Sequence, residues 1–231
     1  MTNSAFKLPF SFDEHLLLED LDSCLKTAWS EHFNRQDYDG KWTSISLRSA
    51  SGKETDIYSH PNTAAYTNTP VLEKCAYFKS IIDLFECEKE AVRLLSLAAG
   101  SVVKEHRDNH AGYESGVFRI HVPIRTNAQV AFFVDGEVVP MKTGECWYAN
   151  VNLPHSVRND GTTDRIHLVI DCKRNEWSDN LFKAMGYDFE FEKQQADYDQ
   201  ETKLKMIEEL SRLDTPVSRQ LLEQLQNELK Q

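Results

Sequence analysis

The hydrophobic positions along the chain change their period twice. In the first part, apolar residues recur at spacings of three and four, which predicts helices over 13–33 and 70–85. Between them, the alternation of residues 41–48 predicts a half-buried strand. Helical spacing returns after Cys172. We therefore expect one compact domain made of an N-terminal segment at 1–90, a core at 91–175 and C-terminal helices at 176–231.

The middle part has the pattern of a β protein. Short runs rich in β-branched and aromatic residues alternate with turn sequences such as Asp135-Gly136 and Asp160-Gly161. Regular punctuation of this kind is typical of an antiparallel barrel or jelly roll. The fold class that we expect is mainly β with flanking helices. The predicted strands are 92–98, 101–106, 117–124, 130–134, 137–141, 145–149, 155–158 and 165–172.

Two amphipathic helices are predicted in the C-terminal part. Their apolar positions are Leu204, Ile207, Leu210, Leu221, Leu222, Leu225 and Leu229. An apolar helical stripe usually packs on its own core, so packing against the β part is the favoured interpretation. The alternative is a contact between two copies of the chain in a homodimer.

Composition and charge restrict the classes of function. Lys and Arg number 26 against 37 Asp and Glu, and the formal charge of −11 disfavours binding to nucleic acid or anionic lipid. The most apolar stretch, residues 91–103, is too short to cross a membrane, and no signal peptide is visible. Five widely spaced cysteines indicate neither a disulfide framework nor a zinc ribbon. We expect a cytoplasmic protein with no nucleic-acid or membrane partner.

Three residues at the ends of predicted strands could hold a metal ion. His106 and Asp108 are two positions apart and so share a face, and His155 starts another strand. Two histidines and one carboxylate form the facial ligand set of non-haem Fe(II) oxygenases, which leaves three coordination positions open. The same set also suits Mn, Co or Zn, so these residues alone do not select iron.

Two strands each present the pattern Arg-x-His on one face, namely Arg119 with His121 and Arg165 with His167. For either strand alone, a solvent-facing polar side is an equally good interpretation. The surrounding region of this acidic chain is rich in basic side chains, however, and this favours an anion site. Arginine binds carboxylates through two parallel hydrogen bonds, so a dicarboxylate could chelate the metal at one end and meet Arg165 at the other.

Five segments of the β part resemble the aspartyl/asparaginyl β-hydroxylases, a branch of the Fe(II)- and 2-oxoglutarate-dependent oxygenases. They are HRD at 106–108, RIHVP at 119–123, GECWY at 144–148, LPHSVRN at 153–159 and RIHLVID at 165–171. Together they cover about residues 92–172, and residues 1–90 resemble the family more loosely. The resemblance implies a double-stranded β-helix, a cupin-like jelly roll with the metal inside its mouth.

The resemblance also implies the metal ligands and the cofactors. It makes His106, Asp108 and His155 the ligands of Fe(II), with 2-oxoglutarate as cosubstrate and O2 as oxidant. Animal members of the family lack the carboxylate ligand, whereas Asp108 is present here, as in many bacterial members. This difference strengthens the metal assignment and weakens the transfer of the animal substrate.

The cosubstrate site implied by the resemblance involves four further residues. Arg165 matches the arginine that binds the far carboxylate of 2-oxoglutarate, and His121 matches a histidine near its chelating end. Arg119 matches an arginine that faces the cosubstrate or the substrate, and His167 is expected in the same site.

The activity expected from these matches is hydroxylation of an unactivated C–H bond in an amino-acid substrate. The family points first to an aspartyl or asparaginyl residue of a peptide or protein, and a free amino acid such as L-proline is the alternative. A cupin-like metal- or anion-binding protein without turnover is the rival from another class. Asp108 favours the enzyme, because a binding protein has no need to leave adjacent coordination positions open.

Overall fold

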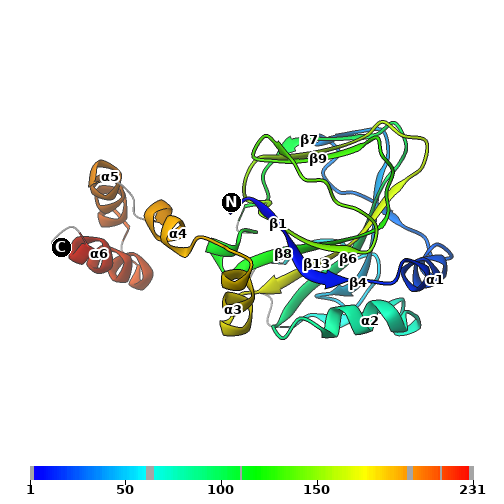
Figure 1. Cartoon of the computed structure of the whole chain (residues 1–231). Helices are drawn as coiled ribbons and strands as arrows, with labels where there is room; N and C mark the ends of the chain where they lie inside the picture. Colours follow the sequence, from blue (N-terminus) through cyan, green and yellow to red (C-terminus); the bar gives the residue numbers. More distant parts are fainter. Residues whose placement is uncertain (1–2, 61–64, 110, 197–199, 214, 229–231) are drawn as a thin grey trace. The chain divides into compact units, whose positions relative to one another are not determined.

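Two antiparallel sheets face each other in the structure, a computed structural model that describes residues 3–60, 65–109, 111–196, 200–213 and 215–228 (Figure 1). The larger sheet has the order β1-β11-β8-β13-β6-β4-β2, with β5 paired to β4, and the smaller sheet has the order β10-β9-β12-β7-β3. The strands of the larger sheet are β1 (Ala5–Ser11), β2 (Ser30–Glu31), β4 (Trp42–Ser49), β5 (Thr67–Asn68), β6 (Lys89–Leu97), β8 (Val117–Arg125), β11 (Glu145–Ala149) and β13 (Arg165–Lys173). Those of the smaller sheet are β3 (Tyr38–Asp39), β7 (Val102–His106), β9 (Val130–Val134), β10 (Glu137–Val138) and β12 (His155–Asn159).

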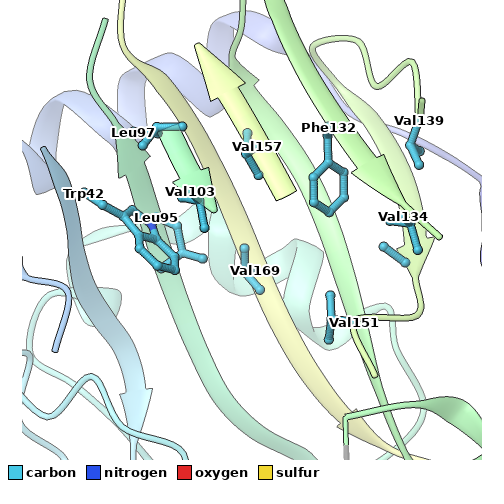
Figure 2. Close-up of a cluster of buried hydrophobic side chains, with 11 residues drawn as sticks. Trp42, Leu95, Leu97, Val103, Phe132, Val134, Val139, Val151, Val157 and Val169 are labelled. Atoms are coloured by element: carbon cyan, nitrogen blue, oxygen red, sulfur yellow. The ribbon is translucent and has the colours of Figure 1, made fainter. Parts of the chain in front are cut away.

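A hydrophobic cluster fills part of the space between the two sheets (Figure 2). The larger sheet contributes Leu95 and Val169, and the smaller sheet contributes Val103, Phe132 and Val157. These side chains alternate with outward-facing neighbours along their strands, as the period of a strand requires. The arrangement confirms the predicted mainly β fold, a jelly roll with flanking helices.

All eight strands predicted for the β part are present. Strands 130–134 and 145–149 have the predicted limits, and the others differ by a few residues at their ends. β6 starts at Lys89, three residues before its predicted start, and β10 ends at Val138 instead of continuing to Met141. There, the N–H of Val139 donates to Phe132 O and that of Met141 donates to Val139 O, so the chain leaves the ladder in a turn.

The sequence did not predict the strands β1, β2, β3 and β5 of the N-terminal part, of which β1 is the longest. β1 forms the edge of the larger sheet beside β11, with Phe6 and Leu8 buried and Lys7 and Pro9 exposed. Proline is tolerated at such an edge because its missing N–H removes no hydrogen bond from the interior of the sheet. The alternation of Phe6, Leu8 and Phe10 was the signal for this strand.

The first predicted helix was too long. α1 (Glu14–Cys24) starts after its N-cap Asp13 and stops at Leu25. The chain beyond it forms β2, which pairs with β4, and the N–H of His32 donates to Trp42 O. Pairing with the sheet therefore overrides the helical spacing of the sequence between residues 25 and 33.

The second predicted helix and the predicted strand 41–48 are present with local differences. A 3-10 turn, Leu72–Lys74, precedes α2 (Ala76–Asp83). β4 is buried on both faces rather than on one. Its serine-bearing face is covered by the following loop, where Glu54 O accepts from the N–H of Ser46 and Asp56 O from its hydroxyl.

The helices after β13 are α3 (Glu176–Ala184), α4 (Phe189–Ala196), α5 (Gln200–Ser211) and α6 (Pro216–Glu228). Two helices were expected here, and the described residues after β13 form four. The chain forms two units, Met1–Tyr187 and Asp188–Gln231, and within the second unit α5 and α6 contact each other. The expected division at residues 90 and 175 stays a prediction. Among the described residues, no helix has the length and apolar character needed to cross a membrane.

Candidate functional site

Three side chains from the smaller sheet meet at its inner face. One nitrogen of His106, one of His155 and one carboxylate oxygen of Asp108 all lie within 4.8 Å of one another. The sheet register brings the imidazoles together, because His155 on β12 is the cross-strand partner of His106 on β7. Asp108 follows β7 and is fixed by its N–H, which donates to Val151 O at 2.8 Å. The structure thus brings together the three residues that the sequence suggested as ligands.

The two imidazoles are oriented by their own backbone. Nδ1 of His106 lies 2.8 Å from Lys104 O, and Nδ1 of His155 lies 3.1 Å from Leu153 O. Each Nδ1–H is the donor to a carbonyl oxygen, which leaves the lone pair of Nε2 available for a metal. Burial lowers the pKa of His155 to about 4, against the opposing charge of Asp108, so this imidazole is neutral at neutral pH.

The two carboxylate oxygens of Asp108 have different surroundings. Oδ1 lies 3.6 Å from Nε2 of His106, whereas Oδ2 accepts a hydrogen bond from the guanidinium of Arg119. Burial opposes ionisation, but the positive charge of Arg119 outweighs it with the help of the histidines and lowers the pKa of Asp108 to about 2. The site therefore offers an ionised carboxylate with one oxygen directed at the imidazoles.

A cavity of about 620 Å³ opens in front of these three residues. Apolar side chains from both sheets form much of its wall, among them Leu95, Val103 and Phe132. His32 also lines the cavity, with its ring stacked on Trp42 at a centroid distance of 3.5 Å. This position of His32 was not predictable from the sequence, because no other candidate ligand lies near it at a recognisable spacing.

A buried cation lies across the cavity from the three candidate ligands. Arg165, at the start of β13, is 3% exposed, and its Nη2 lies 2.9 Å from Nδ1 of His167. Its Nε has no hydrogen-bond partner, and among the described residues no carboxylate forms an ion pair with it. Burial lowers the pKa of Arg165 to about 9, so the side chain stays charged at neutral pH. Burying a guanidinium without a carboxylate partner costs free energy, and an anion in the cavity would supply the missing partner.

The other residues expected in the cosubstrate site occupy three different positions. His121 lines the cavity, is buried and has no hydrogen-bond partner at either ring nitrogen. His167 is not among the residues that line the cavity and contacts Arg165 from behind. Arg119 lines the cavity, but its donors are directed at Asp108 and Asp171.

The residues present fit the metal and the dicarboxylate that the resemblance implies. The donor set of two imidazoles and one ionised carboxylate suits Fe(II). The partnerless donor of Arg165 and the orphaned nitrogens of His121 suit a carboxylate-bearing molecule in the same cavity. Cysteine chemistry has no comparable support, since burial raises the pKa of the Cys146 and Cys172 thiols.

Known proteins resemble this chain in sequence and in fold. A curated relative, an L-proline cis-4-hydroxylase from Rhizobium meliloti (strain 1021), is 27% identical over 74% of this chain, and the match spans 61% of that relative's length. A 2OG-Fe(II) oxygenase family oxidoreductase from Burkholderia pseudomallei has a similar fold, with a TM-score of 0.50 and 14% identity. That likeness covers 74% of this chain and 86% of the other.

The family-level comparison covers most of the chain. The model of the family described as aspartyl/asparaginyl beta-hydroxylase matches residues 13–175. This range includes both sheets' central strands, the three candidate metal ligands and the buried cation opposite them. The protein therefore belongs to the aspartyl/asparaginyl β-hydroxylase family.

Proposed function

We propose that this protein is an Fe(II)- and 2-oxoglutarate-dependent dioxygenase that hydroxylates an unactivated C–H bond of an amino-acid substrate. The observation that carries the proposal is the convergence of His106, Asp108 and His155 on a cavity that is also lined by the buried guanidinium of Arg165, whose Nε has no hydrogen-bond partner. In the net reaction, the substrate, 2-oxoglutarate and O2 give the hydroxylated substrate, succinate and CO2.

In this proposal, three side chains would hold the metal. His106 and His155 would bind it through Nε2, and Asp108 through Oδ1, because the backbone and Arg119 occupy the other polar atoms. Bound Fe(II) supplies the activation of O2 that oxidation of a C–H bond requires. The ligands leave the cavity side of the metal position open to the other reactants.

The opposite wall binds the cosubstrate. Arg165 pairs with the carboxylate of 2-oxoglutarate that is far from the metal, and His167 holds the guanidinium from behind. His121 donates to the end of the cosubstrate nearest the metal. The apolar walls exclude water, which strengthens both ionic contacts.

There are two candidate substrates. Membership of the aspartyl/asparaginyl β-hydroxylase family supports an aspartyl or asparaginyl residue. A free amino acid such as L-proline is supported by the relative described as an L-proline cis-4-hydroxylase. The cavity offers polar partners to either candidate, among them Arg107, Asn109 and Ser115.

Succinate formation tests the function. The purified protein is supplied with 2-oxoglutarate, Fe(II) and O2 and is tested on free amino acids and on peptides that contain Asp or Asn. We expect succinate to form only when all three are present, together with one class of substrate. Metal binding without succinate from any substrate would favour the rival, a cupin-like binding protein.

We further propose a homodimer contact through the C-terminal helices and a cytoplasmic location. The dimer is supported by exposed apolar side chains on or beside α5 and α6, namely Leu204, Leu213, Val217 and Leu221. A dimer that dissociates when Leu204 and Leu221 are replaced by Glu, as measured by light scattering, is the expected result. The location is supported by the free state of all five cysteines and is tested by cell fractionation.

A further inference from the structure

A line of buried ion pairs lies behind the candidate ligand Asp108. Arg119 donates from Nε and Nη2 to the two carboxylate oxygens of Asp171, at 2.6 and 3.1 Å, and its Nη1 donates to Oδ2 of Asp108. Arg93 donates to Asp171 from the other side. All of Arg93, Arg119 and Asp171 are buried, so these contacts are shielded from water. Asp171 has no role in the function proposed above.

The larger sheet fixes the pair of Arg119 and Asp171. The two residues are cross-strand partners on β8 and β13, so the backbone places their side chains on the same face. A guanidinium is planar and its donors have fixed directions. Once Asp171 engages two donors of Arg119, the direction of the third donor is set, and it points across to Asp108 beside the smaller sheet.

Asp171 also balances the charge of this region. Without Asp171, Arg93 and Arg119 would be two neighbouring buried cations, and of these ion pairs only that between Arg119 and Asp108 would be left. Burial disfavours the charged form of Arg119, but the charges of Asp171 and Asp108 outweigh it and raise its pKa. Removing Asp171 would take away the two acceptors that set the direction of Arg119, so its hydrogen bond to Oδ2 of Asp108 would no longer be fixed.

We propose that Asp171 is a positioning residue that acts through Arg119 to keep Oδ2 of Asp108 away from the metal. The inference rests on the proposed function, because it requires Asp108 to be a ligand. Coordination through Oδ1 alone keeps one more position on the metal open than coordination through both oxygens. Since the cosubstrate and O2 need those positions, the orientation set by Asp171 matters for the reaction.

Titration of the metal-free protein with Co(II) tests this role, with the visible absorption of bound Co(II) as a readout of coordination. Partners that orient ligands typically contribute about 10- to 100-fold to metal affinity. We expect Asp171→Asn to weaken Co(II) binding by roughly that factor and to change the spectrum. Arg119→Gln should have a similar effect, and the double variant should bind Co(II) no more weakly than Arg119→Gln alone, because both changes break the same link.

Asp179→Asn is the matched control. Asp179 also pairs with an arginine, Arg174, at 2.7 Å, but neither residue lines the cavity. The Asp179→Asn variant should have the same Co(II) affinity and the same spectrum as the wild type. If Asp171→Asn does not fold, Arg93→Gln combined with Asp171→Asn removes one buried charge of each sign and is expected to show the same loss of affinity and the same spectral change.

An unchanged affinity and spectrum in a folded Asp171 variant would overturn the inference, as would fully additive effects in the double variant with Arg119→Gln. A wild-type protein that binds no Co(II) would instead contradict the proposed metal site. The two failures are therefore distinguishable in one set of titrations.

Discussion

Among the histidines that the structure describes, the two imidazoles of the site differ from the others in having one ring nitrogen fixed by the backbone and the other left for a metal. We expect His155→Ala to abolish succinate formation and to reduce the bound metal, because the remaining residues supply only two of three ligands. His15→Ala is the control, since the side chain of His15 is 80% exposed and pairs with Glu19. Metal content by elemental analysis and succinate formation measure the effect, and full metal content in His155→Ala would count against the ligand role.

Arg165 is the residue on which the cosubstrate depends. A charge-assisted hydrogen bond contributes about 1.5–3 kcal/mol, so Arg165→Ala is expected to raise the KM for 2-oxoglutarate by roughly 10- to 100-fold. Arg165→Lys keeps the charge but loses the paired donors, and should lie between the wild type and Arg165→Ala. A dependence on 2-oxoglutarate that is unchanged in both variants would contradict this role.

Single residues were predictable where their type and their place on a strand carried the signal. The three candidate ligands lie at strand ends, and the spacing of His106 and Asp108 shows that they share a face. Arg93 and His32 had no such signal. Their places in the cavity depend on the pairing of β4 with β6 and β2, which is a contact between distant parts of the chain.

Among the elements, α3 contributes the centre of a large aromatic cluster. Phe182 stacks on Tyr113 at a centroid distance of 3.8 Å and lies edge to face with Phe6 of β1 at 5.1 Å and Phe118 of β8 at 5.2 Å. Its side chain is fully buried. We expect Phe182→Ala to lower the free energy of unfolding by about 3–5 kcal/mol.

Urea denaturation followed by circular dichroism measures that loss. Phe191→Ala on α4 is the matched control, because Phe191 is exposed and its removal should change stability by less than about 0.5 kcal/mol. Equal stabilities of the two variants would show that α3 contributes little to the first unit.

Elements with a strong local period were predictable, and those formed by long-range pairing were not. The strands from β6 to β13 lie between clear turn sequences, and the sequence indicated their limits to within three residues. β1 was missed because Pro9 argues against a strand unless the position is known to be at an edge. The end of α1 was missed because residues 30–31 join β4, which no local pattern indicates.

At the scale of the whole molecule, buried neutral histidines make stability depend on pH. Burial lowers the pKa of His121 and of His167 well below the ordinary 6.5, with Arg165 adding to both, and burial lowers that of His32 to about 3. Below pH 6.5 the unfolded chain takes up protons at these positions while the folded protein does not. Stability is therefore present at neutral pH and is lost as the pH falls.

For each of the two fully buried histidines, His121 and His167, the loss between pH 7 and pH 5 is about 2 kcal/mol. Urea midpoints of the metal-free protein at the two pH values measure it. A midpoint that is constant or higher at pH 5 would contradict the assignment of these histidines as neutral. The pH profile of a His167→Gln variant should be less steep than that of the wild type.

The overall architecture was predictable from the sequence, whereas the arrangement of the C-terminal part was not. Turn spacing predicted the jelly roll, and residues of both its sheets line the cavity beside the candidate ligands. The helical spacing after Cys172 indicated helices but not their number, because short helices joined by few residues have no distinct signal. Their apolar stripes are compatible with several partners, which is why the dimer remains a proposal.

A crystal structure of the protein with Mn(II) and 2-oxoglutarate tests the central claim most directly, because the anomalous signal of the metal identifies its position independently of the ligands. The account predicts one ion bound by Nε2 of His106, Nε2 of His155 and Oδ1 of Asp108, with the far carboxylate of 2-oxoglutarate on Arg165. A metal bound elsewhere, or a cosubstrate that does not contact Arg165, would contradict it.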